Sequence, residues 1–492
     1  MNSILQLKGR FEQRSNTTRP GPANLPKGKS VSSSHIRTLK TQLEEILVHW
    51  TKHKEIAGAL VSVHYKHVVA KSNRLKILLA ESGKTPVDSI RGAKFVWETN
   101  EDGNKVQKHV FTHYVSLKSL AKAIELLEKA ANVIDAGYEE VITHGNIEKI
   151  NSEKVFPYRD IIAKTTFVKV VIDCHHVKSF NIDRIEDSIT EESIVTIYKT
   201  NVETKALLKK FGINIFDDRI IDETTLRLSP DEIQLLLNSA SYLIAMSVTD
   251  LAQLTKDDIL SEDTDDTSAF ERLIPTPQNE PIVGVIDTQF NTDVYFSEWV
   301  EYHNMLDPDI PLQAKDFVHG TEVTSIIVDG PRGNPDLDDG CGRFRVRHFG
   351  VATSGPFSSF SILRSIRKIV ASNRDIKVWN LSLGSSKEIN SCFVSPEAAE
   401  LDRIQSEYDV LFVVAGTNRP EDETKPVMKI GAPADSLNSL VVNSVAFNKQ
   451  PASYTRVGPV LSFFHKPDIS YYGGDGRVAH EKIVVCHDSL GA

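Results

Sequence analysis

Several features that indicate particular classes of protein are scarce or absent in this sequence of 492 residues. The four cysteines are far apart and form no Cys-x-x-Cys pair, which argues against a disulfide framework and a cysteine-bound zinc site. No apolar run is long enough to span a bilayer, and the first residues lack the apolar core of a signal peptide. We therefore predict a cytoplasmic protein with reduced cysteines, no membrane contact, no metal and no cofactor.

An excess of positive charge is also absent. Lysine and arginine number 57 against 66 aspartates and glutamates, so the formal net charge is −9 and the pI is near 6.0. Nucleic-acid-binding domains are usually strongly basic, so we predict no nucleic-acid partner. The content of 40% hydrophobic and 25% charged residues is ordinary for a globular protein, and a chain of this length usually forms about two to four domains.

Residues 1–37 are polar and rich in proline and glycine, and we predict a basic arm there. Eight lysines or arginines occur between Met1 and Lys40, against one acid, Glu12. The pattern is compatible with an arm that docks on an acidic partner and with a solvated tail, and the sequence leaves both interpretations open.

Residues 38–150 are predicted to form an α+β unit without a chemical motif. Apolar residues at helical spacing between Leu39 and Trp50 predict an amphipathic helix over about 38–54, and Ser116 caps a second helix. The segments between these helices have the composition of strands, which are predicted at 59–70, 74–80, 93–98 and 109–115.

Residues 155–252 are predicted to form a second, small α/β unit. Its elements follow in the order β-β-α-β-α-β, with strands at 166–174, 194–199, 224–228 and 242–248 and helices at 202–211 and 230–238. Cys174, His175 and His176 would fall at the end of the first strand. Since neighbours on a strand point to opposite faces, these three side chains would not converge on a metal.

Residues 253–280 are predicted to be an acidic linker that ends in prolines. Six acids occur between Lys256 and Asp266, and such a run is usually solvated. A processing site in this linker is the alternative.

From residue 281 the pattern changes to buried strands that alternate with helices. This predicts an α/β fold with a mostly parallel, doubly wound sheet and a site at the carboxyl ends of the strands. Asp287 closes the first of these strands, and His319 begins the helix that follows. A carboxylate on a rigid strand that holds an imidazole on a rigid helix is the arrangement that a charge-relay pair needs.

Seven short motifs occur in order along residues 281–492. They are Asp287-Thr288, His319-Gly320-Thr321, Asn380 to Gly384, Val414 to Asn418, Gly431 to Ala434, Ala452 to Thr455 with Val457 to Pro459, and Lys466 to Asp468. Together they resemble the signatures of the subtilisin-like serine proteases, the subtilases, in the order aspartate, histidine, asparagine. The resemblance implies a subtilisin-like sheet and a serine endopeptidase that acts on extended polypeptide.

The resemblance also implies a role for three of the matching side chains. Asp287 would orient His319, which would act as general base toward a serine and then as acid toward the leaving amine. Asn418 would donate its side-chain amide to the oxyanion. Taken alone, Asp287 has an ordinary interpretation as a helix cap and His319 as a surface residue, and it is the set of motifs that favours catalysis.

The cleft strand of the family corresponds here to Ser382, Leu383 and Gly384. Their backbone would pair with an extended substrate, and Gly384 would leave room for a substrate side chain. Gln289 and Thr417 are among the residues that depart from the family pattern. Gln289 replaces the usual glycine after Asp-Thr, and the oxyanion strand ends in Ala-Gly-Thr-Asn instead of Ala-Gly-Asn, which inserts Thr417.

The largest departure concerns the nucleophile. The family carries its serine in Gly-Thr-Ser after the Lys-Pro-Asp motif, and no Gly-Thr-Ser occurs in the 492 residues. Ser354 lies before the oxyanion strand, and Ser489 lacks the motif. We expect this chain to be inactive by itself, as a C-terminally incomplete form of a longer protease. The alternative is a non-catalytic pseudo-protease that binds peptides in its cleft.

The resemblance implies two further relations. The 155–252 unit precedes the peptidase domain, where the family's inhibitory propeptides lie, so it would fill the cleft or guide folding. Some bacterial subtilases with long N-terminal regions resemble partners of AAA-type ATPases, and the basic arm at 1–37 would then be the docking element.

Overall fold

The computed structural model of the chain describes most of its residues. These are residues 22–70, 74–99, 103–183, 193–249, 254–255, 274–354, 358–385, 387–419, 428–461, 464–475 and 483–487. Apart from short segments, they form two compact units, the first ending at Ser247 and the second beginning at Val248. Most of the predicted basic arm, the acidic run at 256–266 and Ser489 lie outside the described residues.

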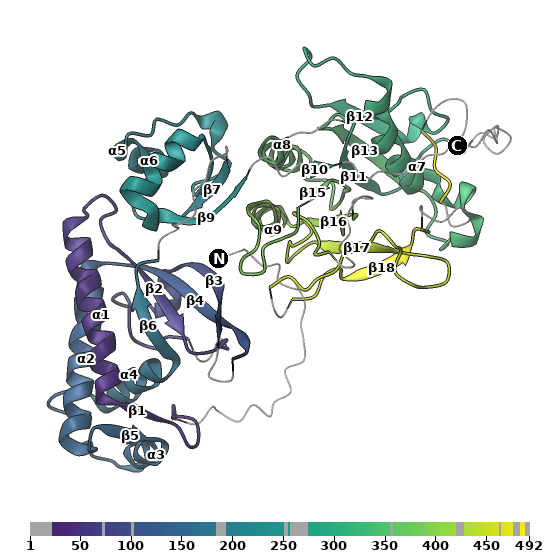
Figure 1. Ribbon diagram of the computed structural model, residues 1–492. Coiled ribbons are helices and arrows are strands. Elements are labelled where there is room, and N and C mark those ends of the chain that lie inside the picture. The colour runs from purple at the N-terminus through teal and green to yellow at the C-terminus, as the bar shows by residue number, and fades with distance from the viewer. Residues whose placement is uncertain are drawn as a thin grey trace. The chain divides into compact units, whose positions relative to one another are not determined.

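The first unit contains a four-stranded antiparallel sheet with the strand order β3-β4-β2-β6 (Figure 1). Its strands are β2 (Ala59–Tyr65), β3 (Ile90–Thr99), β4 (Lys105–Val115) and β6 (Val177–Asn181). The helices of this part are α1 (Ser33–Lys52), α2 (Leu117–Gly137), α3 (His144–Ser152) and α4 (Lys164–His176). Two short strands, β1 (Ser30–Ser32) and β5 (Val141–Thr143), pair antiparallel with each other.

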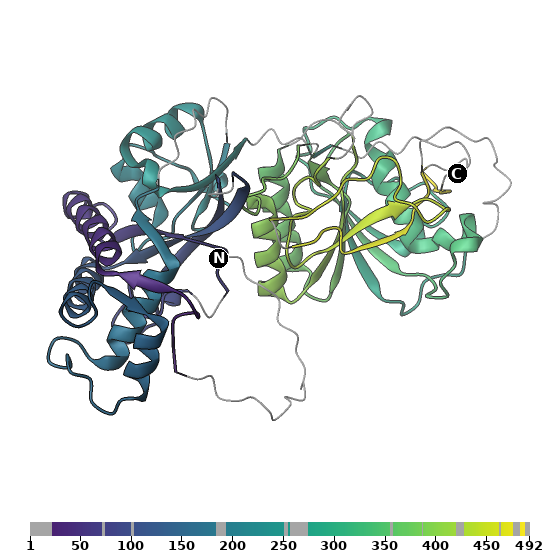
Figure 2. The ribbon, with the colours of Figure 1, turned by 60° about the horizontal axis from the view of Figure 1, so that its bottom comes forward.

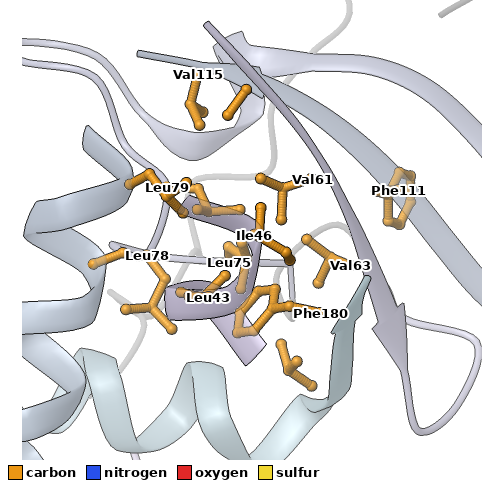
Figure 3. Close-up of a cluster of buried hydrophobic side chains, with 14 of the residues drawn as sticks. Leu43, Ile46, Val61, Val63, Leu75, Leu78, Leu79, Phe111, Val115 and Phe180 are labelled. Carbon is orange, nitrogen blue, oxygen red and sulfur yellow. The ribbon is translucent and has the colours of Figure 1, made fainter. Parts of the chain in front are cut away.

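Helix α1 starts at Ser33, earlier than predicted, because Ser32 caps it. The Ser32 hydroxyl accepts the N–H of His35 and satisfies one of the donors at the helix start. The predicted apolar stripe of α1 is buried and forms part of the core of this unit. Figure 3 shows residues of this core, among them Leu43, Ile46, Val61, Val63 and Phe180.

The rest of the first unit is a three-stranded sheet with the order β8-β7-β9 and two helices. The strands are β7 (Ser193–Ile197), β8 (Thr225–Leu228) and β9 (Ile244–Thr249), and the helices are α5 (Thr204–Lys210) and α6 (Pro230–Ala240). Helix α6 begins with a capping box, in which the side chains of Ser229 and Glu232 each accept the other's backbone N–H.

Two predicted strands of the first unit are wrong. Residues 166–174 belong to helix α4, where packing on several faces overrides the strand preference of their β-branched side chains. Residues 74–80 form turns and not a strand. Their consecutive N–H groups at 76–78 donate to the buried carboxylate of Asp173 on α4, at 2.7, 3.0 and 3.0 Å, so a side chain replaces the neighbouring strand as their partner.

Cys174, His175 and His176 were predicted at the end of a strand, and this is also wrong, because they lie in the last turn of α4. Within the described ranges, however, no group of three or more His, Cys, Asp or Glu side chains is placed to hold a metal ion. Strand β6 follows α4 directly and pairs with β2, so β6 belongs to the first sheet and not to the small one.

The second unit is built on a seven-stranded parallel sheet with the order β12-β13-β11-β14-β16-β17-β18 (Figures 1 and 2). Its strands are β11 (Ile282–Asp287), β12 (Val300–Asn304), β13 (Arg345–Gly350), β14 (Val378–Leu381), β16 (Leu411–Ala415), β17 (Leu440–Val445) and β18 (Ile469–Tyr472). Its helices are α7 (Val318–Gly333), α8 (Ser359–Ser372) and α9 (Pro396–Tyr408).

The connections wind this sheet in two directions. The connection from β11 to β12 runs one way along the sheet and contains no α-helix. The later connections, through α7 from β12 to β13, through α8 from β13 to β14 and through α9 from β14 to β16, run the other way. Figure 1 shows α7 on one face of the sheet and α8 and α9 on the opposite face, so helices cover both faces. The predicted α/β fold with a mostly parallel, doubly wound sheet is therefore confirmed.

Two details of the second unit differ from prediction. Strands β12 and β18 were not predicted, and the last strand predicted from the sequence, over residues 482–488, is not formed by its described residues, 483–487. Instead the backbone of Val484 exchanges hydrogen bonds with the side chain of Asn334 beside α7. None of the described helices of either unit combines the length and the hydropathy needed to span a bilayer.

Candidate active site

The site begins at Asp287, the last residue of β11. This strand lies in the middle of the sheet, between β13 and β14, and Asp287 is fully buried. Its Oδ1 accepts the N–H of Thr288 at 2.7 Å. The apolar residues before Asp287 pack into the core on both faces of the sheet, so the strand holds the Asp287 carboxylate in a fixed position.

His319 meets Asp287 from the first turn of α7. Its Nδ1 lies 2.5 Å from Asp287 Oδ1, with both side chains buried, so the two form a desolvated, charge-assisted pair. Burial by itself would raise the pKa of Asp287, but the charge of His319, its hydrogen bond and the amide of Thr288 hold that pKa below its usual value. Because the carboxylate accepts a hydrogen bond from the Nδ1–H of His319, the lone pair of the neutral imidazole is on Nε2.

The glycine after His319 is required for this approach. A Cβ built on Gly320 would lie 2.6 Å from Gln289 O and 2.7 Å from Thr288 O, closer than real atoms come. The Gly320 N–H donates to the Thr288 hydroxyl at 2.9 Å. Helix α7 therefore touches the end of β11 backbone to backbone, which fixes the distance between Asp287 and His319.

A second buried histidine, His348 on β13, supports this contact and was missed by the sequence analysis. Burial lowers the pKa of His348, so its ring is neutral. Its Nε2 donates to Thr288 O at 2.8 Å, and its Nδ1 lies 3.0 Å from the Thr324 hydroxyl of α7. The available signal was a histidine inside an otherwise apolar strand next to the predicted aspartate strand.

Gln289, the departure from the usual glycine, is accommodated inside the fold. It is fully buried, donates from Nε2 to Ala352 O at 2.8 Å and accepts the Tyr302 hydroxyl at Oε1 at 2.6 Å. The space for it comes from Gly350, where a Cβ would lie 2.2 Å from Gln289 Oε1. The replacement therefore leaves the Asp287–His319 contact unchanged.

The predicted cleft residues follow β14. Ser382 is half-buried and accepts the side-chain amide of Asn380 at 2.9 Å, Leu383 is buried, and Gly384 begins the short strand β15 (Gly384–Ser385). A second two-residue strand, β10 (Leu254–Thr255), pairs with β15 in antiparallel orientation. Backbone groups of the cleft strand thus hold an extended segment of this same chain.

Asn418 lies three residues after β16 and is half-buried. Its backbone bridges to Thr455, and its carbonyl accepts Nε of Arg456 at 2.7 Å. Arg456 is fully buried, and its Nη1 also donates to Ser385 O at 3.4 Å. This arginine, which the sequence did not indicate, joins the backbone at Asn418 to the backbone of the cleft strand at Ser385.

The topology brings the predicted residues to one edge of the sheet. Strands β11, β14 and β16 are parallel neighbours, and adjacent strands lie about 5 Å apart. Asp287, the cleft strand and Asn418 therefore lie at or just beyond carboxyl ends on the same edge of the sheet. His319 reaches the same edge from α7. A buried acid–imidazole pair, an extended-chain site and an amide donor on one edge suit acyl transfer at a peptide bond.

Comparison with known proteins agrees with this geometry in the second unit. Residues 278–490 match the model of the subtilase family, Peptidase_S8. No curated protein matches the chain.

The solved structures that the chain matches include three proteases. The prenylagaramide maturation protease PagA is 17% identical, with 37% of this chain and 59% of that chain covered and a TM-score of 0.28. A mutant of the epidermin leader peptide processing serine protease EpiP from Staphylococcus aureus is 15% identical, with 58% of this chain and 77% of that chain covered and a TM-score of 0.38. The psychrophilic subtilisin-like protease Apa1 from the Antarctic psychrotroph Pseudoalteromonas sp. AS-11 is 16% identical, with 43% of each chain covered and a TM-score of 0.29. The chain thus spans 59% of the length of PagA.

Proposed function

We propose that this chain, in which residues 278–490 are a domain of the subtilase family of serine peptidases, provides the proton relay and the oxyanion donor for cleavage of extended polypeptide. The observation that carries the proposal is the buried contact of 2.5 Å between Asp287 and His319. A neutral imidazole held at Nδ1 by a carboxylate presents Nε2 as a base, which is what a serine nucleophile requires.

In the proposed reaction His319 Nε2 accepts the proton of a serine hydroxyl as its oxygen attacks the scissile carbonyl. Asp287 stabilises the imidazolium that forms, and Asn418 donates its side-chain amide to the oxyanion. His319 then returns the proton to the leaving amine. The substrate backbone adds as a strand along Gly384 and Ser385, and Leu383 supports that strand from the core.

The Gly-Thr-Ser motif that would supply the serine of this reaction does not occur in the sequence. A fluorophosphonate probe, which reacts with an activated serine, tests the proposal directly. We expect the 492-residue chain to remain unlabelled. A form that continues past Ala492 through a Gly-Thr-Ser segment, called here the serine-containing form, should be labelled at that serine. His319→Ala in this form should abolish the labelling, because the hydroxyl then has no base.

Two results would contradict this proposal. Labelling that persists after His319→Ala would show that the probe reacts with a serine that His319 does not activate. A folded serine-containing form that does not react would leave the second candidate, a non-catalytic protein that binds peptides in the cleft.

The pairing of β10 with β15 favours peptide binding by strand addition, with or without catalysis. Thr255 pairs with Gly384, so residues that directly follow the 155–252 segment occupy the proposed substrate strand. Leu254 and Thr255 belong to the predicted linker at 253–280 and not to the 155–252 unit, whose inhibitory role stays a prediction. An AAA-type ATPase stays a predicted partner, since most of the basic arm lies outside the described residues.

Occupation of the cleft by the chain's own segment can be measured by competition. Thr255→Pro removes a backbone N–H and disfavours the added strand. We expect a fluorescent, extended hexapeptide to bind this variant about tenfold more tightly than the wild type in an anisotropy titration, a gain of about 1.4 kcal/mol. Thr255→Val keeps the backbone donor and is the matched control. Equal affinity of all three proteins would show that β10 does not compete for the cleft.

A further inference from the structure

Gly384 was predicted to leave room for a substrate side chain, and in the structure that room is occupied. A Cβ built on Gly384 would lie 2.4 Å from Cγ2 of Thr417, and the backbone oxygen of Ala432 is the next group, at 3.8 Å. Thr417 is the residue inserted into the Ala-Gly-Asn pattern, and only 4% of its surface is exposed. Its methyl group therefore stands directly against the cleft strand.

Two hydrogen bonds hold the Thr417 side chain in this position. Its hydroxyl donates to Gly416 O at 2.6 Å and accepts the N–H of Gly431 at 2.8 Å. Ser385 N donates to Ala432 O at 2.7 Å, so the segment that carries Gly431 runs along the cleft strand. With its oxygen fixed on both sides, Thr417 cannot rotate its methyl group away from Gly384.

The backbone of Thr417 also indicates that this position is held by its surroundings. Its φ is +65°, in the left-handed region that a β-branched residue rarely adopts. Strain of this kind is concentrated at functional sites, where the surrounding contacts determine the conformation. A glycine at position 417 would adopt the same φ without strain, and it would remove both the methyl group and the hydroxyl that binds Gly416 and Gly431.

The pairing of β15 shows which substrate residue would meet Thr417. In the antiparallel register, the residue of the added strand opposite Gly384 is at the position that Thr255 occupies. Directly opposite residues of an antiparallel pair project to the same face of the sheet. A substrate residue opposite Gly384 therefore projects to the side on which a Gly384 Cβ would meet Thr417.

We propose that Thr417 determines specificity, because its methyl group closes the space beside Gly384 and excludes bulky side chains, such as that of leucine, from the opposite substrate residue, where the chain's own residue is the smaller Thr255. This inference rests on the proposed function, namely that the cleft strand binds an extended polypeptide. It adds the class of polypeptide, one with a small residue at a single defined position, to the site described above.

A leucine scan of a bound peptide tests the inference on the full chain. The probes are acetylated hexa-alanine with a fluorophore and six variants that each carry one leucine, titrated by anisotropy. For the wild type we expect one position at which leucine weakens binding at least about tenfold. In Thr417→Gly the penalty at that same position should fall to about threefold or less, while the other positions stay unchanged.

A second variant keeps the test valid if Thr417→Gly alters the loop. Thr417→Ser retains both hydrogen bonds of the hydroxyl and removes only the methyl group, so it should also reduce the leucine penalty at that position. The inference is overturned if the wild type tolerates leucine everywhere, or if the penalty persists in both variants. If none of the seven peptides binds the wild type, the proposed peptide-binding cleft fails as well.

Discussion

Asp287→Asn should lower kcat of the serine-containing form by about four orders of magnitude. The asparagine that replaces the carboxylate would present an N–H to Nδ1 of His319. The neutral ring would then carry its hydrogen on Nε2, and no lone pair would face the serine. The buried negative charge that stabilises the imidazolium would be lost as well, and at full burial no solvent replaces it.

The measurement is steady-state hydrolysis of a peptide amide, with kcat and KM determined separately. Asp293→Asn makes the same chemical change at an exposed loop position and serves as the matched control, with kcat expected to stay within about twofold. A loss of less than about tenfold for Asp287→Asn would contradict the proposed relay. Comparable losses in both variants would point to a general effect of the substitution.

Asn418→Ala should lower kcat of the same form by about 10² to 10³ and leave KM almost unchanged. The expected split follows because the amide is proposed to meet the oxyanion, which exists only in the transition state and the tetrahedral intermediate. The fold of the loop should survive, since Arg456 holds the backbone carbonyl of residue 418, which alanine retains.

Asn418→Asp provides an isosteric comparison. It preserves the shape of the side chain but replaces an N–H donor by a negative oxygen that repels the oxyanion, so its kcat should be at least as low as that of the alanine variant. If either variant raises KM and leaves kcat unchanged, Asn418 binds substrate and transition state equally and has no oxyanion role.

The family and fold of the second unit could be predicted from the sequence because both depend on short-range patterns. Buried strands alternating with helices predict a parallel sheet, and Asp287 and His319 stand at the ends of such elements. Parallel strands bring their carboxyl ends to one edge, so the sequence positions also predict that Asp287, Ser382 to Gly384 and Asn418 lie along that edge.

The same reasoning failed in the first unit where packing opposes local preference. Residues 166–174 are rich in β-branched side chains, yet they form α4 because a helix buries their apolar faces against neighbouring elements. Residues 74–80 are apolar like a strand, but the carboxylate of Asp173 satisfies three of their N–H groups in a turn. The elements that pack on α4 and the carboxylate that binds residues 76–78 are distant in sequence, so no short stretch of sequence predicts these conformations.

The sequence by itself determined the family of residues 278–490, the doubly wound sheet and the pair Asp287 and His319, because periodicity and motif order are local properties. Only the tertiary structure decided what surrounds that pair. His348 and Arg456 support the site through contacts with distant segments, β10 adds to the cleft strand, and Thr417 fills the space beside Gly384. These contacts depend on how elements pack at distances of a few ångströms, which residue order alone does not specify.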